Sequence, residues 1–322
     1  MKQHSLHSIP LRVGISSCLL GTMVRFDGGH KKDRYLTDVL GEYVEWVPVC
    51  PELEAGMGVP RESVRLTGSP ESPRMTGTKS AADWTGPMNE FSKNRVRQLE
   101  SLHLSGFIFK SDSPSCGMER VKVYGSSGMA ARNGRGLFAG AFMKHFPLIP
   151  VEEEGRLNDA KLRDNFIVRM FAYHRLQQLI RRGFTRGDLV TFHSSEKYLL
   201  LAHSPKHYQI LGKLVADAKS HTAAALRDRY AGLFMEALAV KSTVKKNVNV
   251  LQHILGFLRD HLNSAEKENV LCVIDDYAKE LVPLVVPLTL IQHFVSLYNV
   301  PYIREQLYLK PHPKELMLRN HV

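Results

Sequence analysis

LRVGISSC, residues 11–18, is a short run of mainly apolar residues that ends on a cysteine. Two further runs have the same form, EWVPVC at residues 45–50 and GFIFKSDSPSC at residues 106–116. Together with amphipathic stretches and glycine- or proline-containing loops, they predict strands at 11–16, 44–49, 106–110 and 146–151 and helices at 33–43, 88–104 and 136–145. This alternation predicts an α/β N-terminal domain with an open, mainly parallel sheet.

Three of the four cysteines, Cys18, Cys50 and Cys116, lie at or just past the end of a predicted strand. Because ligands of open α/β sheets bind at the carboxyl ends of the strands, these cysteines could converge in space. Their spacing lacks the close cysteine pair of a structural zinc site and differs from a ferredoxin run. Three thiolates suit a 4Fe-4S cluster with one iron left free for a substrate atom, for which sulfur is a good match. Three unrelated buried thiols are the alternative.

The fourth cysteine, Cys272, is flanked by Val-Leu and Val-Ile, which predicts a buried small apolar residue. Four widely spaced cysteines are too few for a disulfide framework. The sequence opens with no charged and apolar leader and contains no apolar stretch of about 18 residues. We therefore expect a cytoplasmic protein with reduced thiols and no membrane partner.

Two proton-handling residues lie close to the cysteines along the chain. Glu52 follows Cys50 by two residues, and Ser113 precedes Cys116 by three. A carboxylate in this position suits a general acid or base, and a serine hydroxyl can donate or relay a proton.

The second half of the sequence has a different pattern. After the break Glu152-Glu153-Glu154-Gly155, apolar residues recur at helical spacing from Asn158 onward, for example Phe166, Met170, Tyr173 and Leu176. This predicts an all-α helical C-terminal domain and a division of the chain into residues 1–155 and 156–322.

The chain is basic, with 43 Lys and Arg against 32 Asp and Glu, a net charge of +11. Such an excess, shared by both halves, suits a polyanionic partner such as nucleic acid, although a solvated basic surface without that partner is the alternative. Cations near an aromatic ring suit phosphate contact and base stacking. The candidate RNA-binding residues are His193, Lys197, His203, Lys206 and Tyr208. Alternatively, the histidines are hydrogen-bonded core or helix-surface residues and the lysines are solvated.

Three motifs in order, SSCLLG, VPVCPE and SDSPSCG, together with Arg61 after Gly-Val-Pro, resemble the thiouracil desulfidase family. The helical remainder resembles the domain of unknown function 1722. The fusion resembles the tRNA 4-thiouridine desulfidases, and the resemblance covers essentially the whole chain.

The resemblance implies that Cys18, Cys50 and Cys116 ligate a 4Fe-4S cluster and that Glu52 and Ser113 are the acid/base pair. It implies hydrolytic, non-redox conversion of 4-thiouridine in tRNA to uridine with release of hydrogen sulfide. Two other functions stay open: a desulfidase of free thiouracil or thionucleotides, and a non-catalytic iron-sulfur RNA-binding sensor.

Overall fold

The computed structural model describes residues 10–320, which divide into two compact units with the boundary between Leu162 and Arg163. Residues 156–162 therefore group with the N-terminal unit. Arg156 accounts for part of this placement, because its guanidinium pairs with Glu152 and Glu119, each at 2.6 Å.

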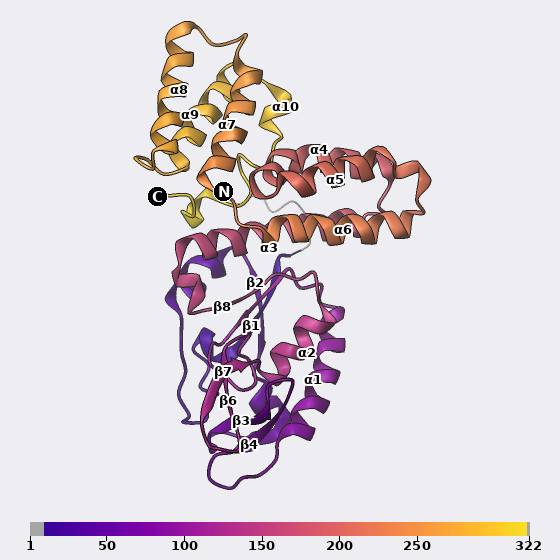
Figure 1. Ribbon diagram of the computed structural model, residues 1–322, viewed down its shortest axis with the longest axis vertical. Coiled ribbons are helices and arrows are strands. Elements are labelled where there is room, and N and C mark those ends of the chain that lie inside the picture. Colours follow the sequence, from indigo (N-terminus) through magenta and orange to yellow (C-terminus); the bar gives the residue numbers. More distant parts are fainter. Residues whose placement is uncertain (1–9, 321–322) are drawn as a thin grey trace. The chain divides into compact units, whose positions relative to one another are not determined.

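A four-stranded sheet organises the N-terminal unit (Figure 1). Its strands, in spatial order, are β2 (Glu45–Val49), β1 (Arg12–Ser16), β5 (Gly106–Phe109) and β8 (Val151–Glu153), and every neighbouring pair is parallel. The predicted open parallel sheet is confirmed. The last strand starts at Val151, so the strand predicted at 146–151 is displaced toward the C-terminus.

Two helices, α1 (Thr85–Glu100) and α2 (Leu137–His145), pack against each other beside this sheet (Figure 1). Aromatic rings fill the space between β5 and α2, with Phe107 and Phe142 centroids 4.6 Å apart. The stretch predicted as a helix at 33–43 is helical, but it consists of a π-helical turn, Tyr35–Val39, followed by a 3-10 turn, Leu40–Glu42, and is not one regular α-helix. Only Leu36 and Leu40 of those two turns are buried, which leaves little apolar surface to stabilise a longer helix.

A second four-stranded sheet was not predicted from the sequence. Its spatial order is β4 (Ser72–Gly77), β3 (Val64–Ser69), β6 (Val121–Tyr124) and β7 (Ala130–Gly134). The β3–β4 and β6–β7 pairs are antiparallel, and β3–β6 is parallel. The strands contain Gly, Ser and Arg at exposed positions, so their hydrophobic alternation is weak.

The C-terminal unit is helical, as predicted. Most of α3 (Ala160–Arg181) belongs to it, and the remaining helices are α4 (Arg186–His203), α5 (Pro205–Ala216), α6 (Ala223–Ala239), α7 (Val244–Leu258), α8 (Ser264–Ala278), α9 (Val285–Leu297) and α10 (Pro301–Arg304). Side-chain caps define five of their starts: Thr185, Ser204, Thr222, Thr243 and Asn263 each accept a backbone N–H hydrogen bond. No helix among residues 10–320 is long and apolar enough to cross a membrane.

The prediction that Cys272 is buried is wrong, because its side chain is exposed. Helix α8 buries Val270, Ile274 and Tyr277, which recur at helical spacing on one face. Cys272 falls outside that stripe, although its immediate neighbours in the sequence are apolar.

Candidate active site

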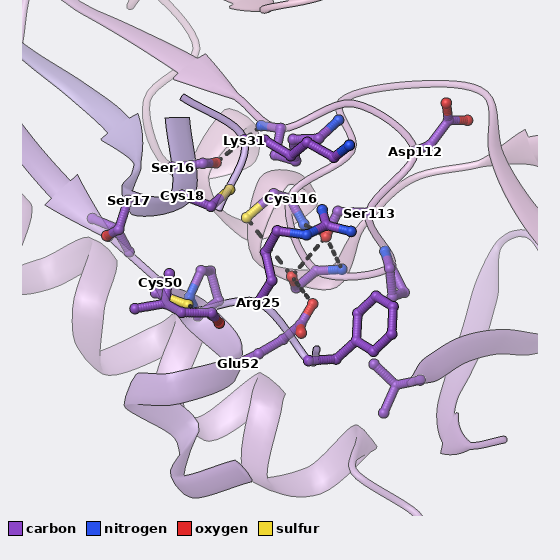
Figure 2. Close-up of a pocket in the computed structure, with 18 of the residues that line it drawn as sticks. Ser16, Ser17, Cys18, Arg25, Lys31, Cys50, Glu52, Asp112, Ser113 and Cys116 are labelled. Carbon is purple, nitrogen blue, oxygen red and sulfur yellow. Dashed lines mark hydrogen bonds between the residues drawn. The ribbon is translucent and has the colours of Figure 1, made fainter. Parts of the chain in front are cut away.

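Three consecutive strands of the parallel sheet lead to the three predicted cysteines. Cys18 lies in the 3-10 turn Ser17–Leu20 that directly follows β1, and Cys50 directly follows β2. Cys116 lies in the loop that follows β5. The carboxyl ends of parallel strands meet at one edge of the sheet, and all three cysteines line one cavity there (Figure 2).

This cavity has a volume of about 380 Å³ and contains thiols in a largely desolvated setting. Burial, with a smaller contribution from Cys50, raises the pKa of the Cys18 thiol to about 11. Burial also raises the pKa of Cys50 and raises that of Cys116 well above its ordinary range. In the absence of a bound cation the thiols are therefore held neutral, and a metal would have to displace their protons.

The donor set of the cavity suits a metal cluster better than a single metal ion. No three His, Cys, Asp or Glu side chains within residues 10–320 lie close enough to hold a single metal ion. In an iron-sulfur cluster each thiolate binds a different iron, so the sulfurs need not meet at one point. Arg25, Lys31 and Lys110 line the same cavity and would offset the negative charge of such a cluster. The residues present fit a 4Fe-4S cluster.

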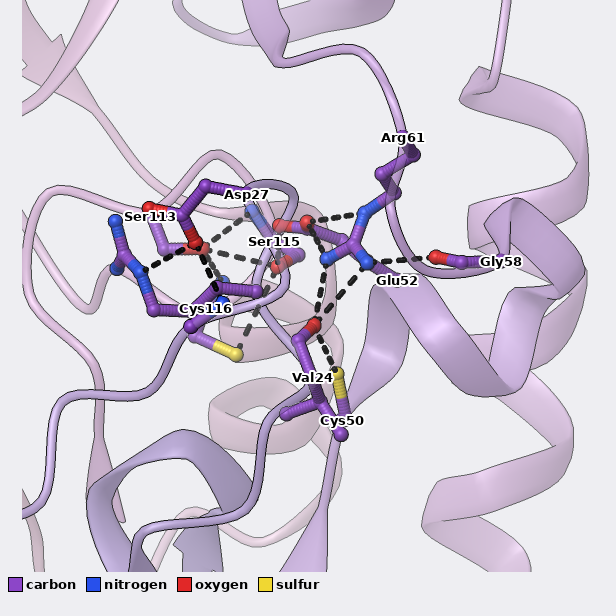
Figure 3. Close-up of polar contacts among 11 residues, drawn as sticks. Val24, Asp27, Cys50, Glu52, Gly58, Arg61, Ser113, Ser115 and Cys116 are labelled. Carbon is purple, nitrogen blue, oxygen red and sulfur yellow. Dashed lines mark hydrogen bonds and ion pairs between the residues drawn. The ribbon is translucent and has the colours of Figure 1, made fainter.

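Glu52 lines the cavity, and its carboxylate is fixed by Arg61 (Figure 3). Arg61 donates from Nε and Nη2 to Glu52 Oε2, at 3.1 and 2.5 Å. The carbonyl oxygens of Val24 and Gly58 accept further bonds from the same guanidinium, so Arg61 is itself held in place. The ion pair is largely withdrawn from solvent, and its two charge-assisted hydrogen bonds fix the orientation of the carboxylate.

The other oxygen of Glu52 faces a pair of serines (Figure 3). Ser115 Oγ donates to Glu52 Oε1 at 2.8 Å and lies 3.0 Å from Ser113 Oγ. Because Ser115 has one hydroxyl proton and gives it to Glu52, Ser113 is the donor between the two serines. A directed chain therefore leads from the Ser113 hydroxyl through Ser115 to the carboxylate.

Ser115 is a site residue that sequence reasoning missed. Its hydroxyl connects Ser113 to Glu52. Because these two residues are far apart in the sequence, their spacing could not predict that a third residue lies between them. The only sequence signal was the Ser-Pro-Ser pattern of residues 113–115. The loop that contains Ser113 and Ser115 is hydrogen-bonded to the start of α2. Leu137 N and Ala139 N donate to the carbonyl oxygens of Pro114 and Ser115. A Cβ on Gly136 would lie 2.5 Å from the Ser115 carbonyl oxygen, so this approach requires glycine.

The candidate RNA-binding residues of the helical unit have different environments. Lys206 is exposed at the start of α5. Half-buried Lys197 lies over the rings of Tyr198 and Tyr302, at 5.1 and 5.9 Å from their centroids. His193 stacks on Tyr208 at an interplanar angle of 8°, which makes a flat aromatic pair.

His203 is a core residue, so it is not available on the surface to contact RNA. Only 4% of it is exposed, and its Nδ1 lies 2.7 Å from the Val240 carbonyl oxygen. The hydrogen-bonded core histidine that the sequence allowed as an alternative therefore describes His203.

Acid is expected to destabilise the helical unit through two histidines. Desolvation lowers the pKa of His193 to about 4, with Lys197 acting in the same direction. Desolvation likewise lowers the pKa of His203 to about 4, reinforced by Arg319 and Lys246 and opposed by Val240 and Asp164. Between the unfolded pKa of about 6.5 and the folded value the unfolded chain binds more protons, so stability falls as pH falls through that window and then levels off. The loss is on the order of 3 kcal/mol for each histidine.

Urea unfolding followed by far-ultraviolet circular dichroism across that pH range measures this loss. The His203→Gln variant keeps a donor for the Val240 carbonyl but cannot bind the proton, so its stability should fall less steeply than that of the native chain. An identical fall in both proteins would show that His203 does not contribute.

The N-terminal unit has a thiol-lined cavity at the carboxyl edge of a parallel sheet, and an oriented carboxylate lies beside the thiols. These features are typical of an α/β enzyme domain, and a helical domain follows it in the chain. Residues 13–154 match the 2-thiouracil desulfurase family, and residues 197–313 match DUF1722, a family of proteins of unknown function. The chain belongs to the 2-thiouracil desulfurase family and has a DUF1722 domain in its helical part.

Known proteins similar to this chain include two bacterial relatives. Uncharacterized protein YbgA of Escherichia coli (strain K12) is 34% identical over 167 residues, covering 51% of this chain and 98% of YbgA. Uncharacterized protein YbbK of Bacillus subtilis (strain 168) is 31% identical over 108 residues, covering 32% of this chain and 71% of YbbK. A solved structure, that of the 4Fe-4S-dependent thiouracil desulfidase TudS, is 26% identical and has a TM-score of 0.39, covering 46% of this chain and 94% of that chain. The matched family places the N-terminal unit among enzymes that remove sulfur from a thiobase.

Proposed function

We propose that this protein converts 4-thiouridine in tRNA to uridine and releases hydrogen sulfide by hydrolysis. The observation that carries the proposal is the meeting, in one cavity, of three cysteines with the chain Ser113–Ser115–Glu52. The cavity volume of about 380 Å³ is within the range of small-molecule sites.

Cys18, Cys50 and Cys116 would hold a 4Fe-4S cluster. When bound, it would supply a soft, Lewis-acidic iron without a protein ligand, suited to the sulfur of a thiocarbonyl. The net reaction is C=S plus water giving C=O plus H₂S, which balances without an electron donor or acceptor.

The protein residues handle the protons of this reaction. A water near the Ser113 hydroxyl can lose a proton into the chain of serines, with Glu52 as the final acceptor. Arg61 orients the carboxylate before the water is deprotonated. That proton returns along the chain of serines to the departing sulfur, and the second proton of the water leaves the attacking oxygen by the same route as the C=O bond forms. Sulfur then leaves as H₂S, and Glu52 acts first as a base and then as an acid.

Two features support tRNA as the substrate. The net charge of +11 favours a polyanion. Within the helical unit, Lys197 and Lys206 offer cations and the stacked His193–Tyr208 pair offers aromatic surface.

The proposal is tested by anaerobic purification and cluster reconstitution of the full chain, followed by incubation with tRNA that contains 4-thiouridine. Nucleoside analysis should show cluster-dependent loss of 4-thiouridine with a matching gain of uridine. Turnover of free 2-thiouracil without turnover of tRNA would instead assign the free-base reaction. Failure on tRNA, nucleoside, nucleotide and free base would leave the non-catalytic sensor.

Salt should weaken processing of tRNA much more than processing of the 4-thiouridine nucleoside, because binding of a polyanion releases counterions. For about three phosphate contacts, kcat/KM on tRNA should fall on the order of tenfold or more between roughly 50 and 200 mM salt. The nucleoside rate, measured in the same buffers, is the control. Parallel salt curves for the two substrates would contradict a tRNA-binding surface.

A further inference from the structure

Four cations of residues 10–320 line the thiol-lined cavity: Arg25, Lys31, Arg61 and Lys110. The N–H groups of Arg61 are taken up by Glu52 and by two backbone carbonyl oxygens. The three N–H groups of the Lys110 ammonium have three acceptors, the Glu154 carboxylate and two oxygens of Ser111. Arg61 and Lys110 therefore have no further N–H group to offer a substrate.

Arg25 has a different environment from these two cations. Its Nε lies 3.5 Å from Asp27 Oδ1, and within residues 10–320 its two terminal amino groups make no hydrogen bond to protein. Only 22% of its side chain is exposed, whereas Lys31 is exposed to solvent. In Figure 2 the Arg25 side chain extends into the cavity, toward Ser113 and Cys116. Arg25 thus brings a mostly enclosed positive charge and unused N–H groups to the thiols.

The turn that carries Arg25 is closed by hydrogen bonds. Arg25 N donates to Gly29 O at 3.2 Å, and Gly28 N donates to Arg25 O at 2.9 Å. Gly28 has a φ of 75°, in the left-handed region that favours glycine. Gly29 N also donates to Asp27 Oδ1 at 3.0 Å, which turns that carboxylate toward the Arg25 guanidinium. The direction of the Arg25 side chain is therefore fixed by its own turn.

Arg61 holds both chain neighbours of Arg25. Nη1 and Nη2 of Arg61 each lie 3.1 Å from Val24 O, and its backbone N–H donates to Phe26 O at 2.9 Å. The Arg25 guanidinium lies over the Phe26 ring, 5.5 Å from its centroid. Because Arg61 also orients Glu52, one arginine supports both the carboxylate and the segment that carries Arg25. Charges fixed in advance in this way stabilise a transition state without reorganisation during the reaction.

The hydrolysis proposed for this cavity develops negative charge at an unfavourable place. When the C–S bond breaks, its electron pair goes to the sulfur, which still needs the protons that arrive along the serines. Three thiolates and the Glu52 carboxylate would lie around this sulfur, so like charges oppose it. A guanidinium offsets that charge, but it stays protonated and cannot supply the proton itself.

We infer that Arg25 is a catalytic residue that stabilises the negative charge on the sulfur as it leaves the thiobase. The inference rests on the proposed function and adds a second task to the proton transfer by Glu52 and the serines. The serines deliver the protons to the sulfur, and Arg25 stabilises its charge until they arrive. Arg25 neither gains nor loses a proton, so the balance of the hydrolysis is unchanged.

Steady-state kinetics on the 4-thiouridine nucleoside tests this role without any binding of a polyanion. Arg25→Gln should lower kcat on the order of 10²-fold, as removal of a preorganised donor usually does, and leave KM within about threefold. Arg25→Lys keeps the charge but not the forked geometry, so it should recover part of the rate. Asp27→Asn should have a smaller effect than Arg25→Gln, because the guanidinium remains. A loss confined to KM would assign Arg25 to substrate binding and overturn the inference.

Titration of hydrosulfide into the reconstituted full chain, followed by absorbance, is a second readout that needs no turnover. Arg25→Gln should weaken hydrosulfide binding by about tenfold or more, the usual effect of losing a charge-assisted hydrogen bond, at native iron content. Arg74→Gln is the matched control. Arg74 also pairs with an aspartate, Asp83 at 2.8 Å, but does not line the cavity, so this variant should bind hydrosulfide as the native chain does.

Native affinity for hydrosulfide in Arg25→Gln would overturn the inference. Loss of iron from that variant would do the same, because Arg25 would then serve to retain the cluster. If the native chain turns over no thiolated substrate, the proposed function fails. Weaker hydrosulfide binding in Arg25→Gln than in Arg74→Gln would even then support the stabilisation of sulfur charge by Arg25.

Discussion

Replacing Glu52 with glutamine is expected to lower kcat on the order of 10²–10⁴-fold, the usual effect of losing a positioned general base, while the protein keeps its iron. The carboxylate of Glu52 accepts from Arg61 on one oxygen and from Ser115 on the other. A glutamine amide can accept on only one side. Its NH₂ group would face either the Arg61 donors or the Ser115 hydroxyl. In both cases the hydrogen-bond chain from Ser113 through Ser115 loses its final proton acceptor.

The measurement for Glu52→Gln is single-substrate kinetics alongside the iron and acid-labile sulfide content of the same preparation. Glu45→Gln is a matched control, because Glu45 also pairs with an arginine, Arg12 at 3.2 Å, but outside the cavity. The control should retain near-native turnover. Iron loss in Glu52→Gln, or activity within about twofold of native, would contradict a role in proton transfer.

Replacing Cys116 with alanine is expected to abolish both iron binding and activity. Cys116 is the most deeply buried of the three thiols that line the cavity, and a methyl group in its place offers no donor to iron. The apo fold should survive, because the polar contacts of the thiol are weak ones to serine hydroxyls, Ser16 and Ser115, the latter at 3.7 Å.

Absorbance of the reconstituted protein, iron content and turnover measure the effect of Cys116→Ala. Cys272→Ala removes the same group from an exposed position on α8 and should leave all three unchanged. Circular dichroism of the apo proteins shows whether Cys116→Ala folds. A folded variant that still binds iron at native stoichiometry would show that Cys116 is not a ligand.

Local sequence patterns were sufficient where one segment carries its own signal. The apolar runs ending at Cys18, Cys50 and Cys116 predicted the parallel sheet, and helical periodicity predicted the C-terminal unit. Parallel strands bring their carboxyl ends to one edge, so the meeting of the cysteines followed from the strand assignments. Glu52 and Ser113 were found because they lie within three residues of a cysteine.

The same local reasoning failed for Cys272 and His203, whose environments depend on distant residues. The neighbours of Cys272 in sequence are apolar, but the stripe of Val270, Ile274 and Tyr277 faces the interior and leaves Cys272 outside. His203 resembles a surface cation in the sequence, yet it is enclosed and bonded to Val240. Whether a helical residue is buried depends on which face of its helix packs against other helices. That face is determined by the tertiary structure of the whole helical unit.

The strand–cysteine pattern and the helical half were encoded locally, because backbone periodicity and residue type act over a few neighbouring positions. The second sheet and the hydrogen bonds from Arg61 and Ser115 to Glu52 became visible only in the folded chain. Each joins residues from separate segments, and strand pairing and side-chain contacts over such separations are fixed by packing rather than by local pattern.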